Sequence, residues 1–262
     1  MGARTQLQTR TPGSSDRDDR EFALMSASTL RKLRPAKVRT ALRRRWFEYR
    51  MPGRLQLRGI GGLADLGSRP GGWTFPTDLL EPSWICYMVG AGGDVLVDLD
   101  LIHGYGVTVR SFDAVEGYVD NALGQAGDEP RFSAHHAAIA LEDGPLLMQP
   151  THEAGSESVS PAQLYESHDM IELPGRSLPS LMAELGDERI DLLKIDIEGG
   201  EYEVVPDLDL RALGVKVFSV QMHHNGSVRD ACELVASLRE QGYDPVACRP
   251  AVKVTFVRRD LI

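Results

Sequence analysis

The chain has 262 residues, of which 42% are apolar and 26% are charged, a composition typical of a globular protein rather than a fibrous or disordered one. Its three cysteines are too few and too scattered for a disulfide framework or a zinc site. No apolar run reaches the roughly 20 residues needed to span a bilayer, and the first residues lack the apolar centre of a signal peptide. These features predict a cytoplasmic protein without stable membrane insertion.

The net charge of −9 is unevenly distributed. Residues 1–50 carry 13 Lys or Arg against five Asp or Glu, a net of +8, so the remaining residues carry −17. The basic block 31–45 can contact nucleic acid or an anionic membrane, or fold back as a helix on the acidic remainder of the chain. We favour the second interpretation and expect no nucleic-acid partner, because an acidic body is a poor platform for phosphates.

The N-terminal part of the chain divides by composition. Residues 1–27 are polar and predict a disordered or leader segment. Residues 28–80 form an extension, in which 28–50 predict a basic helix interrupted or kinked near Pro35. Gly and Pro recur over 51–80 around few apolar positions, which indicates mostly loop. The main folded domain is therefore expected over 81–262.

Apolar runs and amphipathic stretches then alternate along the chain. Strands are expected at Ile85–Val89, Val107–Phe112, Arg131–Ala138, Asp191–Ile195, Val215–Met222, Tyr243–Cys248 and Val252–Val257, and helices at about 94–103, 115–124, 177–185 and 227–241. This alternation predicts an α/β fold with a doubly wound, mostly parallel sheet. The last two strands lie too close together for a crossover helix and must form a C-terminal antiparallel hairpin. Residues 150–170 predict an irregular insertion, long enough to be a lid or substrate loop.

A glycine-rich turn, residues 90–93, follows the first strand of the domain. Glycines here let the backbone approach a ligand closely at the start of a helix. The dinucleotide fingerprint would require glycine at position 95, which is Val95, and this argues against NAD or FAD. Asp113 ends the next strand 23 residues after Gly90, near the spacing at which an acidic residue takes ribose hydroxyls, although a lone Asp there is often only a helix cap. The two signals together predict a nucleotide-like cofactor.

A second strand runs into the acidic cluster Asp196, Glu198 and Glu201, with two glycines between them. Parallel sheets bind ligands at the carboxyl ends of their strands, so these carboxylates are expected at the same site as the glycine turn. His223 ends the strand after that and should face Asp196. The alternative for this histidine is a satisfied core or cap residue.

Four segments resemble the FkbM family of S-adenosylmethionine-dependent methyltransferases. They are Tyr87-Met-Val-Gly-Ala-Gly-Gly-Asp94, Ser111-Phe-Asp113, Leu192-Leu-Lys-Ile-Asp-Ile-Glu-Gly-Gly-Glu201 and Gln221-Met-His-His224. The resemblance covers about residues 70–258. It implies a class I, Rossmann-like methyltransferase domain over 81–262, with a seven-stranded sheet whose last strand is reversed.

The resemblance also implies cofactor contacts, with S-adenosyl-L-methionine as the cofactor. The residues it assigns to the cofactor are Val89, Gly90, Ala91, Gly92, Asp113, Ala137, Ala138 and Asp196. Of these, residues 90–92 line the methionine part, Asp113 holds the ribose and the two alanines lie near the adenine. The chain departs from the family at Ala114, where many members have Pro, and at Gln221, where they often have Glu. The second departure removes a charge near the reaction site and weakens any metal site.

A neutral hydroxyl acceptor needs a base within hydrogen-bond reach. We expect the catalytic residues to be Asp196, His223 and Glu198. Asp196, Glu198 and a histidine could instead bind a divalent ion that acidifies the hydroxyl, but no complete ligand set can be identified and no metal is expected.

The predicted function is O-methylation of a small-molecule hydroxyl, in a natural product or sugar. The alternatives are N-methylation of another small acceptor and a non-catalytic nucleoside-binding protein of the same fold. The sequence specifies neither the acceptor nor an oligomeric state.

Overall fold

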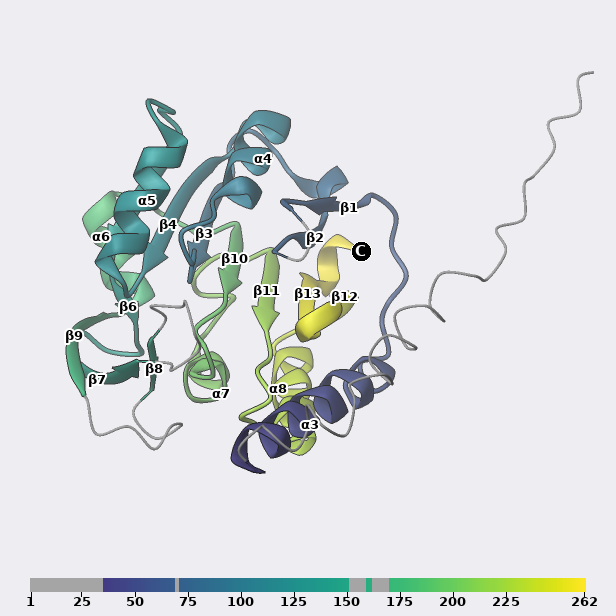
Figure 1. Cartoon of the computed structure of the whole chain (residues 1–262). Coiled ribbons are helices and arrows are strands. Elements are labelled where there is room, and N and C mark those ends of the chain that lie inside the picture. The colour runs from purple at the N-terminus through teal and green to yellow at the C-terminus, as the bar shows by residue number, and fades with distance from the viewer. Residues whose placement is uncertain (1–34, 69–70, 151–158, 162–169) are drawn as a thin grey trace, which may run out of the picture. The chain divides into compact units, whose positions relative to one another are not determined.

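The computed structural model describes residues 35–68, 71–150, 159–161 and 170–262 (Figure 1). Two compact units are distinguished, residues 1–43 and residues 44–262. The predicted disordered segment 1–27 lies outside the described residues. No helix in the described ranges is both long and apolar enough to cross a membrane.

The second unit is built around a seven-stranded sheet in the order β12-β13-β11-β10-β3-β4-β5 (Figure 1). The strands are β3 (Ile85–Val89), β4 (Thr108–Asp113), β5 (Phe132–His136), β10 (Leu192–Ile195), β11 (Val217–Gln221), β12 (Tyr243–Arg249) and β13 (Lys253–Arg258). Neighbouring strands from β5 to β11 are parallel. Only β13 is antiparallel to both of its neighbours. The predicted mostly parallel sheet with a C-terminal hairpin is confirmed.

Helices connect the parallel strands. They are α4 (Leu96–Tyr105), α5 (Glu116–Ala126), α6 (Leu178–Leu185), α7 (Glu201–Val204) and α8 (Val228–Glu240), with short 3-10 turns at Pro52–Arg54, Thr77–Leu79, Val205–Asp207, Pro250–Val252 and Arg259–Leu261. Helix α8 begins at a capping box, in which Ser227 and Asp230 satisfy each other's backbone N–H groups. Helix α6 begins after Ser177, whose side chain accepts from a backbone N–H of the first turn.

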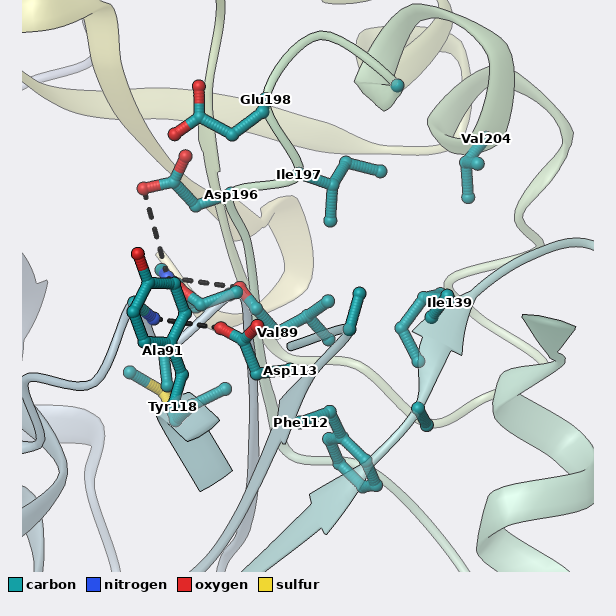
Figure 2. Close-up of a pocket in the computed structure, with 18 of the residues that line it drawn as sticks. Val89, Ala91, Phe112, Asp113, Tyr118, Ile139, Asp196, Ile197, Glu198 and Val204 are labelled. Carbon is teal, nitrogen blue, oxygen red and sulfur yellow. Dashed lines mark hydrogen bonds and ion pairs between the residues drawn. The ribbon is translucent and has the colours of Figure 1, made fainter. Parts of the chain in front are cut away.

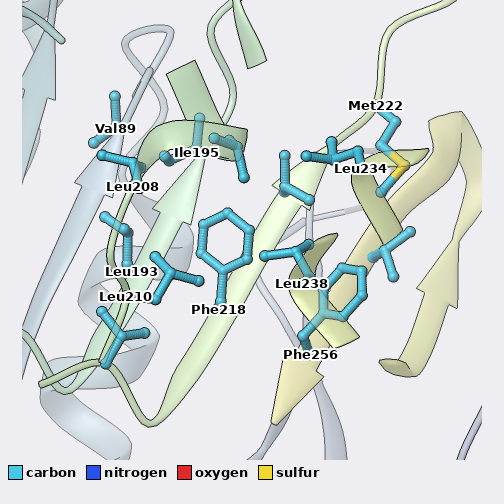
Figure 3. Packing of buried hydrophobic residues seen from close by; sticks show 14 of the residues in the cluster. Val89, Leu193, Ile195, Leu208, Leu210, Phe218, Met222, Leu234, Leu238 and Phe256 are labelled. Atoms are coloured by element: carbon cyan, nitrogen blue, oxygen red, sulfur yellow. The ribbon is translucent and has the colours of Figure 1, made fainter. Parts of the chain in front are cut away.

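The two faces of the sheet carry separate apolar cores because side chains alternate along each strand. On one face, Leu193, Ile195 and Phe218 pack with Leu234 and Leu238 of α8 (Figure 3). On the other face, the alternate residues of the strands pack against helix α4 and against the antiparallel hairpin of β1 and β2. Both faces are therefore covered, as a doubly wound sheet requires.

Two smaller sheets were not predicted. Strands β1 (Leu63–Leu66) and β2 (Trp73–Pro76) form an antiparallel hairpin, so the prediction that 51–80 is mostly loop is wrong there. Strands β6 (Ala138–Ile139), β7 (Gly144–Pro150), β8 (Val159–Pro161) and β9 (Ile171–Arg176) form a second sheet in the order β6-β9-β7-β8. Short strands containing Pro and Gly give little periodicity, which is why β7 and β9 were not predicted.

Within the predicted insertion 150–170, the described residues are Pro150 at the end of β7, strand β8 and Met170. Strand β8 contradicts an irregular structure at 159–161. Residues 151–158 and 162–169 lie outside the described residues. The segment expected to end as a single strand at Ala138 is also divided, since β5 stops at His136 and Ala138 begins β6.

The basic helix α3 (Pro35–Arg50) begins at Pro35, the position of the predicted interruption, while 28–34 lie outside the described residues. Proline is well tolerated in a first helical turn, where its missing N–H has no partner to lose. Phe47 and Met51 are 2% and 0% exposed and belong to the same core cluster as α8. Both residues belong to the second unit, so its core includes the last turn of α3.

Candidate active site

The glycine turn after β3 requires glycine at position 90. Gly90 has a φ of +73°, and a Cβ placed there would lie 1.7 Å from the backbone oxygen of Asp196. Gly92 also has a positive φ, +61°, but faces open space. The turn at Gly90 therefore packs against the end of β10, and a side chain there would push the two apart.

A buried lysine supports this turn. Lys194 of β10 is 5% exposed, and its Nζ donates to the backbone oxygens of Val89 at 3.0 Å and Gly90 at 2.6 Å. The same ammonium lies 3.9 Å from a carboxylate oxygen of Asp196. This role of Lys194 could not be predicted, because the position of a lysine in an apolar strand does not show which groups its ammonium contacts.

Asp113 lies at the end of β4, 8% exposed. Its Oδ2 accepts from Gly92 N and its Oδ1 from Val115 N, both at 2.9 Å. Burial raises the pKa of Asp113, and these two hydrogen bonds act in the opposite direction. Asp113 thus caps α5 and fixes the glycine turn at once, and each oxygen keeps a lone pair for a further donor.

These residues line one cavity of about 400 Å³ (Figure 2). Its apolar lining includes Val89, Ala91, Phe112, Ala137, Ala138 and Ile139. Its charged lining consists of Asp94, Asp98, Asp113, Asp196, Glu198, Glu203, Lys194 and Lys253. This lining fits a nucleoside that carries a positive charge. The glycine turn lets the ligand approach the backbone, the small side chains leave room for a flat base, and the excess of carboxylates favours a cation. Every residue predicted to contact the cofactor lines this cavity.

Asp196, Glu198 and His223 converge at the ends of neighbouring segments. The Nε2 atom of His223 lies 3.7 Å from Asp196 Oδ1 and 3.4 Å from Glu198 Oε2. Asp196 Oδ1 is buried and has no hydrogen-bond partner within the described part of the chain. Asp196 follows the last residue of β10, whereas His223 lies two residues beyond β11, so the expectation that it ends this strand is wrong by two positions.

Glu201 orients His223. Glu201 is fully buried, and its Oε1 lies 3.0 Å from His223 Nδ1 and accepts from the His223 backbone N–H at 2.6 Å. Its Oε2 accepts from Gly199 N at 2.9 Å. The sequence placed Glu201 in the acidic cluster but did not show that it points inward, away from Asp196 and toward the imidazole.

This arrangement raises the pKa of His223 to about 9. Burial by itself lowers the value, but the charge and hydrogen bond of Glu201 outweigh it, with further contributions from Asp196 and Glu198. His223 is therefore an imidazolium at neutral pH, which can donate hydrogen bonds from both nitrogens. The amide nitrogen of Gln221 lies 2.9 Å from His223 Nε2. Both atoms are donors when His223 is charged, so in that state the amide must be turned to present its oxygen to Nε2–H.

Asp196, Glu198 and His223 also offer one ligand atom each within 4.8 Å of one another. Two carboxylates and an imidazole are a chemically reasonable set for a divalent ion. The ion would have to displace the proton that His223 carries.

The order of the seven strands, the reversed β13, the glycine turn after β3 and the acidic residue ending β4 define a class I methyltransferase fold. The sequence profile of the Methyltransferase FkbM domain matches residues 109–245, more than half of the chain. The chain belongs to the FkbM family of methyltransferases, which use S-adenosylmethionine. The match is shorter than the predicted span of 70–258 and begins after the glycine turn.

Among solved structures, the chain is similar to the Methanococcus jannaschii fibrillarin pre-rRNA processing protein, with 10% sequence identity and a TM-score of 0.42. That similarity covers 74% of this chain and 70% of the fibrillarin chain. No curated protein sequence matches significantly.

Proposed function

We propose that this methyltransferase transfers a methyl group to the hydroxyl of a small-molecule acceptor, with Asp196 and His223 handling the proton. One observation carries the proposal. Asp196 lines the cavity, and one buried oxygen of its carboxylate has no hydrogen-bond partner among the described residues and lies 3.7 Å from the Nε2 of His223, which is not itself part of the lining. A hydroxyl oxygen placed between them could donate to the carboxylate and accept from the imidazolium.

Cofactor binding is assigned to the residues around the glycine turn. Gly90 and Gly92 would let the cofactor lie close to the backbone. Asp113 would accept hydrogen bonds from the ribose hydroxyls. Ala137 and Ala138 would leave room for the adenine. The bound cofactor would supply an electrophilic methyl group on a sulfonium, so the protein's task is alignment and the removal of one proton.

Asp196 is the proposed proton acceptor. Asp196 and His223 were both candidates for the base from the sequence. The raised pKa of His223 favours Asp196 as the base and gives His223 a different role. Its Nε2–H would stabilise the negative charge that develops on the acceptor oxygen. Glu201 would keep the imidazole charged and correctly oriented, as a positioning residue that does not touch the acceptor.

Mass spectrometry tests the reaction. Small-molecule extract from the producing cells is incubated with the enzyme and isotope-labelled S-adenosylmethionine. We expect a labelled methyl ether. A label found only on nitrogen, only on nucleic acid or on no small molecule would contradict the proposal.

Substitutions then test the roles. Asp196→Asn and His223→Ala should each lower turnover by about 10²- to 10⁴-fold, as removal of a proton-transfer group typically does, while binding of S-adenosylhomocysteine changes little. His224→Ala is the matched control and should stay close to wild type. The wild-type rate should fall as pH rises through about 9, where the imidazolium is lost. A rate that rises to a plateau there would make His223 the base instead.

Metal dependence is tested separately. We expect chelation to leave turnover unchanged. Loss of activity on chelation, restored by added magnesium, would assign Asp196, Glu198 and His223 to a metal site.

A further inference from the structure

Helix α3 presents two large aromatic side chains to solvent, far from the chemistry of the cavity. Trp46 is 54% exposed and Tyr49 is 81% exposed. Between them, Phe47 is buried in the core of the second unit. A helix turns by about 100° per residue, so Tyr49 points about 160° away from Phe47 around the helix axis. The core contacts of Phe47 therefore hold Tyr49 out toward solvent.

Arginines flank the two aromatic side chains. Residues 44–54 carry a net charge of +3, from one glutamate and the four exposed arginines Arg44, Arg45, Arg50 and Arg54. The guanidinium carbon of Arg50 lies 5.8 Å from the centroid of the Trp46 ring, within the range of a cation–π contact. Residues 55–262 carry a net charge of −18. The exposed aromatic pair therefore lies in the basic part of an otherwise acidic chain.

A hollow of about 380 Å³ adjoins this surface. Arg45 and Tyr49 of α3 line it together with residues 248–252, at the turn between β12 and β13. Glu48 lines it as well, but its Oε1 lies 2.9 Å from Nε of Arg44, so the charge of this carboxylate is balanced. An anionic head group in the hollow would therefore meet a guanidinium and an aromatic ring.

Exposed Trp and Tyr rings with arginines beside them suit a membrane–water interface. There the rings lie at the level of the head groups and the guanidinium groups attract anionic lipids. We propose that this surface docks the protein on an anionic phospholipid membrane, with Trp46 and Tyr49 entering the head-group layer and Arg45 binding a lipid phosphate. Because Phe47 stays in the core of the second unit, the contact is peripheral.

Charge and apolar area together favour a membrane over other partners. A second copy of the chain would bring one positive surface against another, which is unfavourable. Duplex nucleic acid or an acidic peptide would pair with the arginines but would offer no apolar layer in which to bury two rings. Residues 1–34 carry a net charge of +3, so they add to the attraction for an anionic surface rather than compete for it.

Tryptophan fluorescence tests the docking directly. The chain has three tryptophans, and the other two, Trp73 and Trp84, are 3% and 2% exposed, so quenching by brominated lipids reports on Trp46. Vesicles of phosphatidylcholine with about 30% phosphatidylserine should sediment the full chain and quench this fluorescence, whereas pure phosphatidylcholine should do neither. Raising the salt from about 0.1 M to about 1 M should weaken binding, because it shortens the screening length about threefold.

Matched substitutions separate the aromatic and the charged contributions. Trp46→Ser and Tyr49→Ser should each weaken vesicle binding about 5- to 10-fold through the lost apolar burial. Arg45→Gln should weaken it about fivefold, the contribution of one arginine near an anionic surface. The controls are Leu123→Ser, an exposed apolar side chain on α5, and Arg229→Gln, an exposed arginine on α8. Both should bind like wild type.

Circular dichroism and thermal melting confirm that each variant is folded, as expected for exposed positions. The proposal is overturned if the wild-type chain does not bind the phosphatidylserine vesicles, or if the three variants in α3 bind them as tightly as wild type. Binding to duplex DNA or polyglutamate without quenching by the vesicles would also overturn it, in favour of a polyanionic partner. Dimerisation that Trp46→Ser abolishes, again without vesicle binding, would assign the surface to a second copy of the chain.

Discussion

Replacing Glu201 with glutamine should release His223 from its charged state. The substitution keeps the size of the side chain and can keep a hydrogen bond to the imidazole, but it removes the buried negative charge. Glu201 makes the largest contribution that raises the pKa of His223. In the variant, burial would be opposed only by Asp196 and Glu198, so the pKa should fall well below 9.

The size of the effect on stability follows from the size of the pKa shift of His223. The pKa of His223 rises from the usual 6.5 to about 9, which corresponds to about 3 kcal/mol of preference for the protonated form in the folded state. A raised histidine pKa stabilises the fold fully below pH 6.5, and this stabilisation is lost as pH rises through about 9. The wild-type free energy of unfolding should therefore fall by about 3 kcal/mol across that window, and the Glu201→Gln curve should be flatter.

Two measurements check this prediction. NMR titration of the imidazole Cε1–H reports the pKa of His223 directly, and urea unfolding between pH 6 and pH 9.5 reports the stability. Glu203→Gln, an exposed position on the same helix, is the matched control and should behave like wild type. If His223 titrates at the same pH in Glu201→Gln as in wild type, Glu201 does not set its charge and the positioning role is refuted.

Four further predictions concern the cofactor site and the N-terminal segment. Gly90→Ala should abolish binding of S-adenosylhomocysteine in calorimetry, because its Cβ would overlap the oxygen of Asp196. Gly92→Ala should cost only about 1–2 kcal/mol of stability by thermal melting, since its strain is conformational alone. Asp113→Ala should weaken binding by about 2–4 kcal/mol in a folded protein, and unchanged affinity would leave Asp113 as a cap only. Deleting residues 1–24 should leave the melting temperature and turnover intact, and a large loss of either would show that the segment has a structural role.

The seven-stranded sheet could be predicted because its strands are short apolar runs that end at Gly or Asp. The hairpin of β12 and β13 could be predicted from the short connection alone, since no helix fits between the strands. The position of the site at the ends of β3, β4 and β10 followed from the rule that ligands bind at the carboxyl ends of parallel strands. These inferences depend only on the hydrophobic pattern of each short segment and on the direction in which the chain runs through each strand.

Side-chain direction could not be predicted. Glu198 and Glu201 look equivalent in the sequence, yet the first is partly exposed beside Asp196 and the second is fully buried beneath His223. Glu198 has a φ of +51°, so the turn that separates the two carboxylates departs from any regular period. Trp73 and Lys253 are separated by most of the chain and meet only through the hairpin β1–β2. No spacing rule connects such residues.

The pairing of β3 with β10 has a consequence for how the protein folds. Ile85 N is hydrogen-bonded to the Asp191 side chain across 106 residues, and Cys86 lies beside Leu192 in the parallel register. Contacts this distant in sequence require a large loop to close first and form slowly. Lys194 reaches the glycine turn only after that closure. A chain that stops before β10 lacks both Lys194 and Asp196 of the proposed cofactor site, so S-adenosylmethionine should stabilise only the chain in which β3 and β10 have paired.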